Sequence, residues 1–292
     1  MPQPSARSST MPAAPALRRA VASVIALVVL CSMAAAAAPG AGGAVAPAPS
    51  SVAGARSAEL VIFEAASLKE VFAKLARRFE REHPGTKVVT NAAGSQELRA
   101  QIEHGAVADV FASADRKHVD ALVAQGLADP PQIFACNEPV VVVRAGLAAT
   151  VKTFADLPRA ERLVVGAPDV PIGAYAARIV KNAASRYGAD FAVRLEARVA
   201  SRELNVRQVL AKVVLGEADA GIVYRSDALA APPGTIGIVT VPAELNVRAE
   251  YPLAVLKQAP QPELARQWSA LVTSQAGAAA LLEAGFVACP KP

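Results

Sequence analysis

Phe63-Glu64-Ala65-Ala66-Ser67-Leu68-Lys69-Glu70 lies in the middle of residues 60–85, the stretch that decides the fold. The apolar run at residues 60–63 predicts a short buried strand. From Leu68 onward, apolar residues recur every three or four positions and predict a helix that ends at His83-Pro84-Gly85. Ser67 and Glu70 have the spacing of a capping box at the start of that helix.

A strand that joins a helix through small residues leaves free backbone N–H groups at the helix start. Together with the helix dipole, these groups favour an anion. The alternative is that Ser67 only caps its helix. A second junction of the same kind follows, because the strand at residues 87–90 leads through small residues to Ser95 and another helix.

Short strands and helices continue to alternate along the chain, with further strands expected near residues 109–113, 140–143, 162–166 and 221–224. This alternation predicts an α/β fold of two lobes, each a mostly parallel sheet flanked by helices. We expect residues 59–137 plus 252–292 to form the first lobe and residues 138–251 the second. Ligands of such sheets bind beyond the carboxyl ends of the strands, where Ser67 and Ser95 fall.

The first residues have the layout of an export signal. Three arginines precede the apolar stretch at residues 20–38, which ends in an alanine run. We expect a signal peptide over residues 1–38, a disordered linker over residues 39–58 and a periplasmic or otherwise extracytoplasmic location. A retained membrane anchor and lipid attachment at Cys31 are the alternatives.

The net charge of +5 is weak support for a nucleic-acid partner. Residues 1–55 contain three arginines and no acid, so three of the five excess charges belong to the expected leader. The remaining basic residues are scattered along helices beside acids, which is typical of solvated faces. We expect no nucleic-acid partner.

Removal of the leader would take Cys31 with it and leave two cysteines, Cys136 and Cys289. In an oxidising compartment an even pair is a candidate disulfide. Two separate buried thiols are the other interpretation.

Catalytic patterns are lacking in the sequence. His83, His104 and His118 are isolated and are interpreted as solvated side chains, so we expect no metal-ion ligands. There is no nucleophile elbow and no phosphate-binding loop, and Cys136 has no histidine in a comparable strand-end position. The chain is therefore expected to bind rather than to catalyse, and to use no cofactor.

Six segments carry a family resemblance, in order along the chain: residues 63–68, 101–106, 108–115, 170–176, 205–207 and 221–228. They resemble the periplasmic molybdate-binding proteins of ABC importers, over about residues 59–286. The resemblance implies the type II periplasmic-binding-protein fold, with the ligand in the cleft between two lobes. It also implies a membrane permease as partner, and we expect a monomer.

The resemblance further implies an oxyanion held by neutral donors. Ser67 and Ser95 match the binding serines, Ile172 and Val206 match positions that donate backbone N–H groups, and Tyr224 matches a tyrosine whose hydroxyl completes the set. Such donors suit a dianion such as molybdate or tungstate. They reject phosphate, whose O–H needs an acceptor, whereas sulfate must be rejected by size. Without the resemblance, Tyr224 would be a core-edge tyrosine and Ile172 and Val206 ordinary core residues.

Two acids depart from the family pattern. Glu64 stands where a small residue is usual, and Glu97 lies near Ser95; a carboxylate facing the ligand would repel a dianion. Strand alternation points Glu64 away from the ligand. The alternatives for function are a binding protein for another oxyanion or a small organic acid, a secreted α/β hydrolase, and a ligand-sensing domain of a regulator.

Overall fold

The computed structural model describes residues 58–290. The expected signal peptide and all of the expected linker except Ala58 lie outside these residues. None of the helices formed by residues 58–290 has both the length and the apolar character that crossing a membrane requires.

The first of two five-stranded sheets has the strand order β2-β1-β3-β10-β4. Its strands are β1 (Ala58–Ala65), β2 (Thr86–Ala93), β3 (Val110–Ala112), β4 (Gln132–Asn137) and β10 (Ala249–Val255). The helices that accompany it are α1 (Lys69–Glu82), α2 (Ser95–Glu103), α3 (Arg116–Ala124), α8 (Pro262–Thr273) and α9 (Gln275–Glu283). We call this sheet with its helices the first lobe.

The second sheet has the order β7-β6-β8-β5-β9. Its strands are β5 (Pro139–Arg144), β6 (Leu163–Gly166), β7 (Val199–Glu203), β8 (Ala220–Tyr224) and β9 (Ile236–Thr240). Its helices are α4 (Pro171–Tyr187), α5 (Ala189–Glu196), α6 (Val206–Val214) and α7 (Arg225–Leu229). We call this unit the second lobe.

The chain passes between the lobes at two places, from β4 directly into β5 and from β9 back to β10. In the first sheet β1 pairs in parallel with β2 and β3, whereas β10 pairs antiparallel with β3 and β4. The second sheet has the same mixture, with β6 parallel to β7 and β8 and β5 antiparallel to β8 and β9. The antiparallel pairs therefore all involve β5 or β10, the strands that enter a new sheet from the other lobe.

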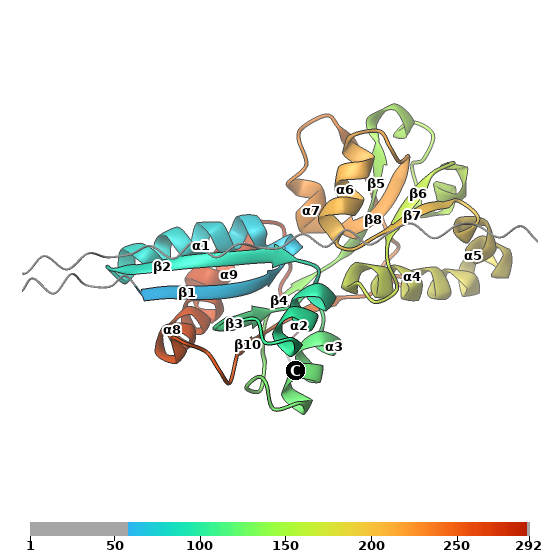
Figure 1. Cartoon of the computed structure of the whole chain (residues 1–292). Helices are drawn as coiled ribbons and strands as arrows, with labels where there is room; N and C mark the ends of the chain where they lie inside the picture. The colour runs from blue at the N-terminus through green and yellow to red at the C-terminus, as the bar shows by residue number, and fades with distance from the viewer. Residues whose placement is uncertain (1–57, 291–292) are drawn as a thin grey trace, which may run out of the picture. The chain divides into compact units, whose positions relative to one another are not determined.

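Helix α1 packs along the first sheet beside β1 and β2 (Figure 1). The predicted apolar face is buried, with Val71, Phe72, Leu75, Ala76 and Phe79 turned inward. Trp268 of α8 meets the rings of Phe72 and Phe79 edge-on, with ring centroids 5.3 and 5.6 Å away. This packing fixes α1, and with it the strand–helix junction at Ser67, against α8.

Candidate anion-binding site

The starts of four helical segments meet at a small cavity between the lobes. Its volume is about 20 Å³. The first lobe contributes Ala65, Ala66, Ser67, Ala93, Gly94, Ser95 and Ala114, and the second contributes Val170, Pro171, Ile172, Asn205, Val206 and Tyr224. All five residues of the expected ligand set are thus brought together from positions far apart in the chain.

Ser67 lies in a 3-10 turn, Ala66–Leu68, between β1 and α1. The predicted capping box is wrong, because neither this turn nor α1 has a side-chain cap. The Ser67 hydroxyl instead lies 2.9 Å from the hydroxyl of Tyr251 on β10, and Glu70 pairs with Arg207 of α6. Tertiary partners have replaced the local hydrogen bonds that the spacing suggested.

Ser95 is the first residue of α2, and its Oγ accepts a hydrogen bond of 3.1 Å from the backbone N–H of Ala114. The capping role here belongs to Glu97, whose Oε2 accepts the N–H of Gly94 at 3.0 Å. Glu97 is not among the residues that line the cavity. Its carboxylate is therefore committed to the helix start, and the Ser95 proton is free to point at a ligand.

Ile172 and Val206 lie in the first turns of α4 and α6, and their side chains are buried. Pro171 occupies the first position of α4, where a missing N–H costs nothing. Asn205 caps α6 by accepting the N–H of Gln208 at 3.1 Å. Because first-turn N–H groups have no partner within their helix, both residues can donate to an anion in the cavity.

Tyr224 ends β8 and is 1 % exposed, yet its hydroxyl has no hydrogen-bond partner among residues 58–290. Burial raises its pKa well above the ordinary value for tyrosine, so the hydroxyl keeps its proton. An unpaired buried hydroxyl is costly. A bound anion would accept a hydrogen bond from this hydroxyl and remove that cost.

Charged side chains stay out of the cavity wall, since no lysine, arginine, aspartate or glutamate of residues 58–290 lines it. The same part of the chain contains no group of three or more histidine, cysteine, aspartate or glutamate side chains that could hold a metal ion. The site offers neutral N–H and O–H donors on helix dipoles, which is a setting for a small anion and not for a cation.

Glu64 is fully buried but faces away from the cavity. Strand alternation places it with Leu60 and Ile62, on the face of β1 that packs against α1, and it does not line the cavity. Neither carboxylate oxygen has a hydrogen-bond partner among residues 58–290. Burial raises the pKa of Glu64 to about 8, and the Thr90 side chain opposes this only in part. The acid is therefore held mostly neutral and does not present a charge to the ligand.

Glu64 should make the protein less stable as the pH rises. Between its ordinary pKa of 4.5 and about 8, the folded state holds a proton that the unfolded state has released. The free energy of unfolding should therefore fall with pH across this window, by up to about 1.4 kcal/mol per pH unit. Glu64→Gln, which stays neutral, should reduce this slope in urea unfolding at about pH 5 and about pH 8; Asp227, whose pKa burial raises to about 7, contributes the remainder. Glu59→Gln, at an exposed position of the same strand, is the control; a slope as steep in Glu64→Gln as in the wild type would contradict the assignment.

Several contacts cross from one lobe to the other around the cavity. Gln96 Nε2 donates to the carbonyl oxygen of Leu204 at 2.7 Å, and Arg207 Nε donates to the carbonyl oxygen of Ala66 at 3.3 Å. Lys117 pairs with Asp169 of the second lobe. These contacts hold the lobes closed over the cavity.

His118 corrects the expectation that all three histidines are solvated. It is fully buried on α3, and its Nε2 lies 3.0 Å from the carbonyl oxygen of Asp169. No local pattern indicates this burial, because it comes from the contact of a first-lobe helix with the second lobe.

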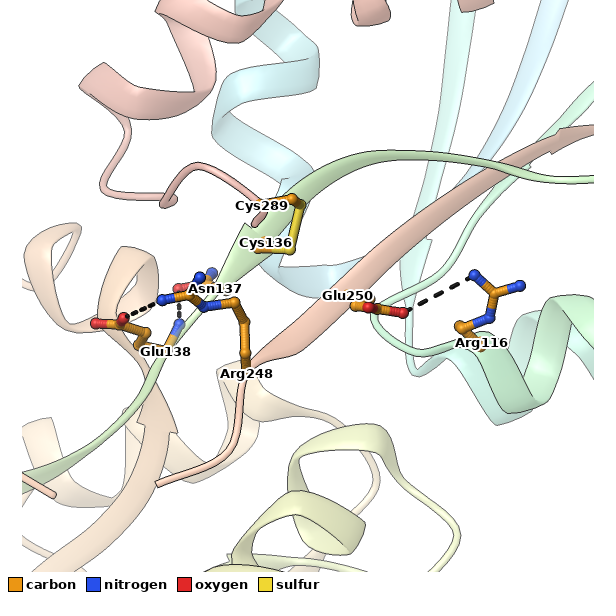
Figure 2. The surroundings of a disulfide bond; sticks show 7 residues. All are labelled: Arg116, Cys136, Asn137, Glu138, Arg248, Glu250 and Cys289. Carbon is orange, nitrogen blue, oxygen red and sulfur yellow. Dashed lines mark hydrogen bonds and ion pairs between the residues drawn. A yellow bond between two sulfur atoms is a disulfide. The ribbon is translucent and has the colours of Figure 1, made fainter. Parts of the chain in front are cut away.

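A disulfide joins Cys136 on β4 to Cys289 in the C-terminal segment (Figure 2). The backbones of Cys136 and Val287 also exchange two hydrogen bonds, of 3.3 and 2.8 Å. The next residue, Asn137, accepts the N–H of Glu138 on its side-chain oxygen at 2.9 Å, and Arg248 pairs with Glu138 at 3.3 Å. The disulfide therefore links the segment around Cys289 to the strand that leads into the second lobe.

The sequence analysis did not predict two residues that hydrogen-bond to serines lining the cavity, Tyr251 and Ala114. Each contacts a serine of the expected ligand set through the tertiary fold, across 184 and 19 positions of the chain. Nothing in their local sequence marks them.

Comparison with known proteins identifies the family. Residues 60–287 match the family model described as bacterial extracellular solute-binding protein. The chain is 42% identical over 235 residues to the molybdate-binding protein ModA of Mycobacterium tuberculosis, covering 80% of this chain and 85% of that protein. It is 37% identical to ModA of Escherichia coli, covering 74% and 84%. The substrate-binding domain of a putative molybdenum ABC transporter from Clostridium difficile has a TM-score of 0.61 and 28% identity, over 80% of this chain and all of that one. This chain belongs to the bacterial extracellular solute-binding protein family.

Proposed function

We propose that this protein captures molybdate outside the cytoplasm and delivers it to the membrane permease of an ABC importer. It performs no chemical step. The observation that carries the proposal is the cavity itself, which is small, lies between the lobes and is lined by neutral donors from four helix starts. The relatives named molybdate-binding protein ModA support the same ligand.

The ligand set that we propose is Ser67, Ser95 and Tyr224 through their hydroxyls and Ile172 and Val206 through their backbone N–H groups. A dianion accepts from all five and needs no donor in return. Tungstate has nearly the same size and charge as molybdate, so we expect it to bind as well.

The location and partners follow from this function. The protein acts outside the cytoplasm, as its family does, and we propose that a signal peptide at residues 1–38 directs it there. It works as a monomer whose two lobes, residues 59–137 plus 252–292 and residues 138–251, meet the permease together. It has no nucleic-acid partner.

Molybdate and tungstate should raise the melting temperature of a chain that begins at Ser57. A ligand at one hundred times its dissociation constant adds about 2.7 kcal/mol, which corresponds to a shift of roughly 5 to 10 °C for a protein of this size. Sulfate and phosphate should leave the melting temperature unchanged. No shift with any of the four anions, or an equal shift with sulfate, would contradict the proposal.

Ser67→Ala and Tyr224→Phe should each weaken molybdate binding by about 10- to 100-fold, because a hydrogen bond to a charged group contributes roughly 1.5 to 3 kcal/mol. Isothermal titration calorimetry measures the two dissociation constants. Ser269→Ala and Tyr187→Phe are matched controls in α8 and α4, since neither residue lines the cavity. Equal losses in the controls would mean that the two hydroxyls do not contact the ligand.

A further inference from the structure

We infer that Arg207 is a positioning residue for the anion: it reaches from the second lobe to the turn that carries Ser67 and keeps the donor groups of both lobes around one ligand. Arg207 does not itself line the cavity. The inference rests on the proposed function, and it assigns retention of the ligand to a residue outside the proposed ligand set.

Arg207 follows Val206 directly, as the second residue of α6. Its side chain extends to the first lobe, where Nε–H donates to the carbonyl oxygen of Ala66 at 3.3 Å and Nη2 pairs with the carboxylate of Glu70. The Ala66 carbonyl and the Ser67 N–H belong to one planar peptide group, so this hydrogen bond also fixes the direction of that N–H. An arginine side chain can only donate, so the direction of both contacts is settled.

Asp227 holds the same guanidinium within the second lobe. It is the third residue of α7, which begins directly after Tyr224, and it is fully buried. Its Oδ1 lies 2.8 Å from Arg207 Nε, and no other cation of residues 58–290 pairs with it. A buried carboxylate that loses its cation is costly. Asp227 therefore keeps the guanidinium beside α7, in the position from which it reaches the first lobe.

The contacts of Arg207 join three of the five proposed donors. Ser67 lies next to its backbone acceptor, the Val206 N–H belongs to the residue before it, and Tyr224 ends the strand that leads to its buried carboxylate. The Arg207 side chain is only 24 % exposed, so water and salt screen these contacts less than those of a surface pair. Without them, the donors of the two lobes could separate while each lobe stays folded, and the anion would leave sooner.

Two other ion pairs provide matched controls. Lys117 and Asp169 also pair across the lobes, but their side chains are 58 % and 56 % exposed. Arg202 and Glu196 pair within the second lobe. None of these four residues lines the cavity. The first pair tests whether any ion pair between the lobes would retain the ligand, and the second tests whether loss of any arginine–glutamate pair would weaken binding.

The test compares Arg207→Met, Lys117→Met and Arg202→Met with the wild type, each as the whole chain. Methionine keeps an unbranched apolar side chain and has no N–H. Calorimetry measures the dissociation constant of molybdate, and exchange of radioactive for unlabelled molybdate measures its release rate. The pH is about 8, where the Asp227 carboxyl, whose pKa burial raises to about 7, is mostly ionised.

Arg207→Met should weaken molybdate binding about 10- to 100-fold, because it removes contacts of a partly buried charge. The release rate should rise by a similar factor, since most losses of affinity appear as faster dissociation. Lys117→Met and Arg202→Met should each stay within about threefold of the wild type. Should Arg207→Met not fold because Asp227 has lost its cation, Arg207→Met combined with Asp227→Asn removes both charges and takes its place.

Glu70→Gln tests the contact from the other lobe. It should weaken molybdate binding about three- to tenfold on its own. In the Arg207→Met background it should change the dissociation constant by no more than about twofold, because its partner is already gone.

An unchanged dissociation constant and release rate in Arg207→Met would overturn the inference, and if urea unfolding is easier in that variant, Arg207 only stabilises the fold. Equal losses in Lys117→Met or Arg202→Met, or losses that multiply when Glu70→Gln and Arg207→Met are combined, would overturn it too. A wild type that does not bind molybdate would contradict the proposed function itself, so the two failures are distinguishable.

Discussion

Gly173→Ala should unfold more easily by about 3 kcal/mol or more and should bind molybdate about 10- to 100-fold more weakly. Gly173 is the third residue of α4, and a methyl group there would lie 2.1 Å from the carbonyl oxygen of Ala167 and 2.4 Å from that of Gly166. Both obstacles are backbone atoms at the end of β6, which cannot turn aside as a side chain could. The helix start would have to move away from the strand.

That displacement would reach the ligand, because Ile172 immediately precedes Gly173 and its N–H is one of the proposed donors. Urea unfolding measures the loss of stability, and calorimetry with molybdate measures the loss of affinity. Gly146→Ala is the matched control, since its new methyl group would meet only the flexible end of Arg144, at 3.0 Å. If Gly173→Ala and Gly146→Ala behave alike, the close approach of α4 to β6 does not support the site.

Loss of the disulfide should lower the free energy of unfolding by about 3 to 5 kcal/mol, because the bond closes a loop of 153 residues in the unfolded chain. Cys289→Ser removes it with least disturbance of packing, since Cys289 is only partly buried whereas Cys136 is fully buried. The C-terminal segment should loosen first. It would then be held by the backbone pairing of Cys136 with Val287 and by the buried ring of Phe286.

Urea unfolding with and without a thiol reductant measures this contribution. The reductant should lower the free energy of unfolding of the wild type by as much as the substitution does. It should not change the free energy of unfolding of Cys289→Ser. A wild type that is as stable in reductant as without it, while its two thiols are shown to be free, would mean that the packing of Phe286 alone holds the segment.

The sequence by itself determined the periodic parts of this protein. Its α/β alternation follows from short apolar strands and from helices with one apolar face, as in α1, where all five buried residues lay on the predicted stripe. These patterns are local, because the period of each element decides which side chains share a face. The order of six family segments, together with Ser67 and Ser95 at helix starts, was sufficient to predict a ligand set, and the loss of Cys31 with the expected leader left Cys136 and Cys289 as the candidate pair.

Only the tertiary structure decided which partner each polar group takes. Ser67 and Glu70 had the spacing of a capping box, yet Ser67 bonds Tyr251 and Glu70 bonds Arg207. The sequence predicted a solvated His118, whereas in the structure it is buried against Asp169 of the second lobe. A hydroxyl or carboxylate can satisfy its hydrogen bonds locally or across the fold at similar free energy. The hydrogen-bond partner of each group therefore depends on which distant residues the fold brings close to it. The local sequence does not identify those residues.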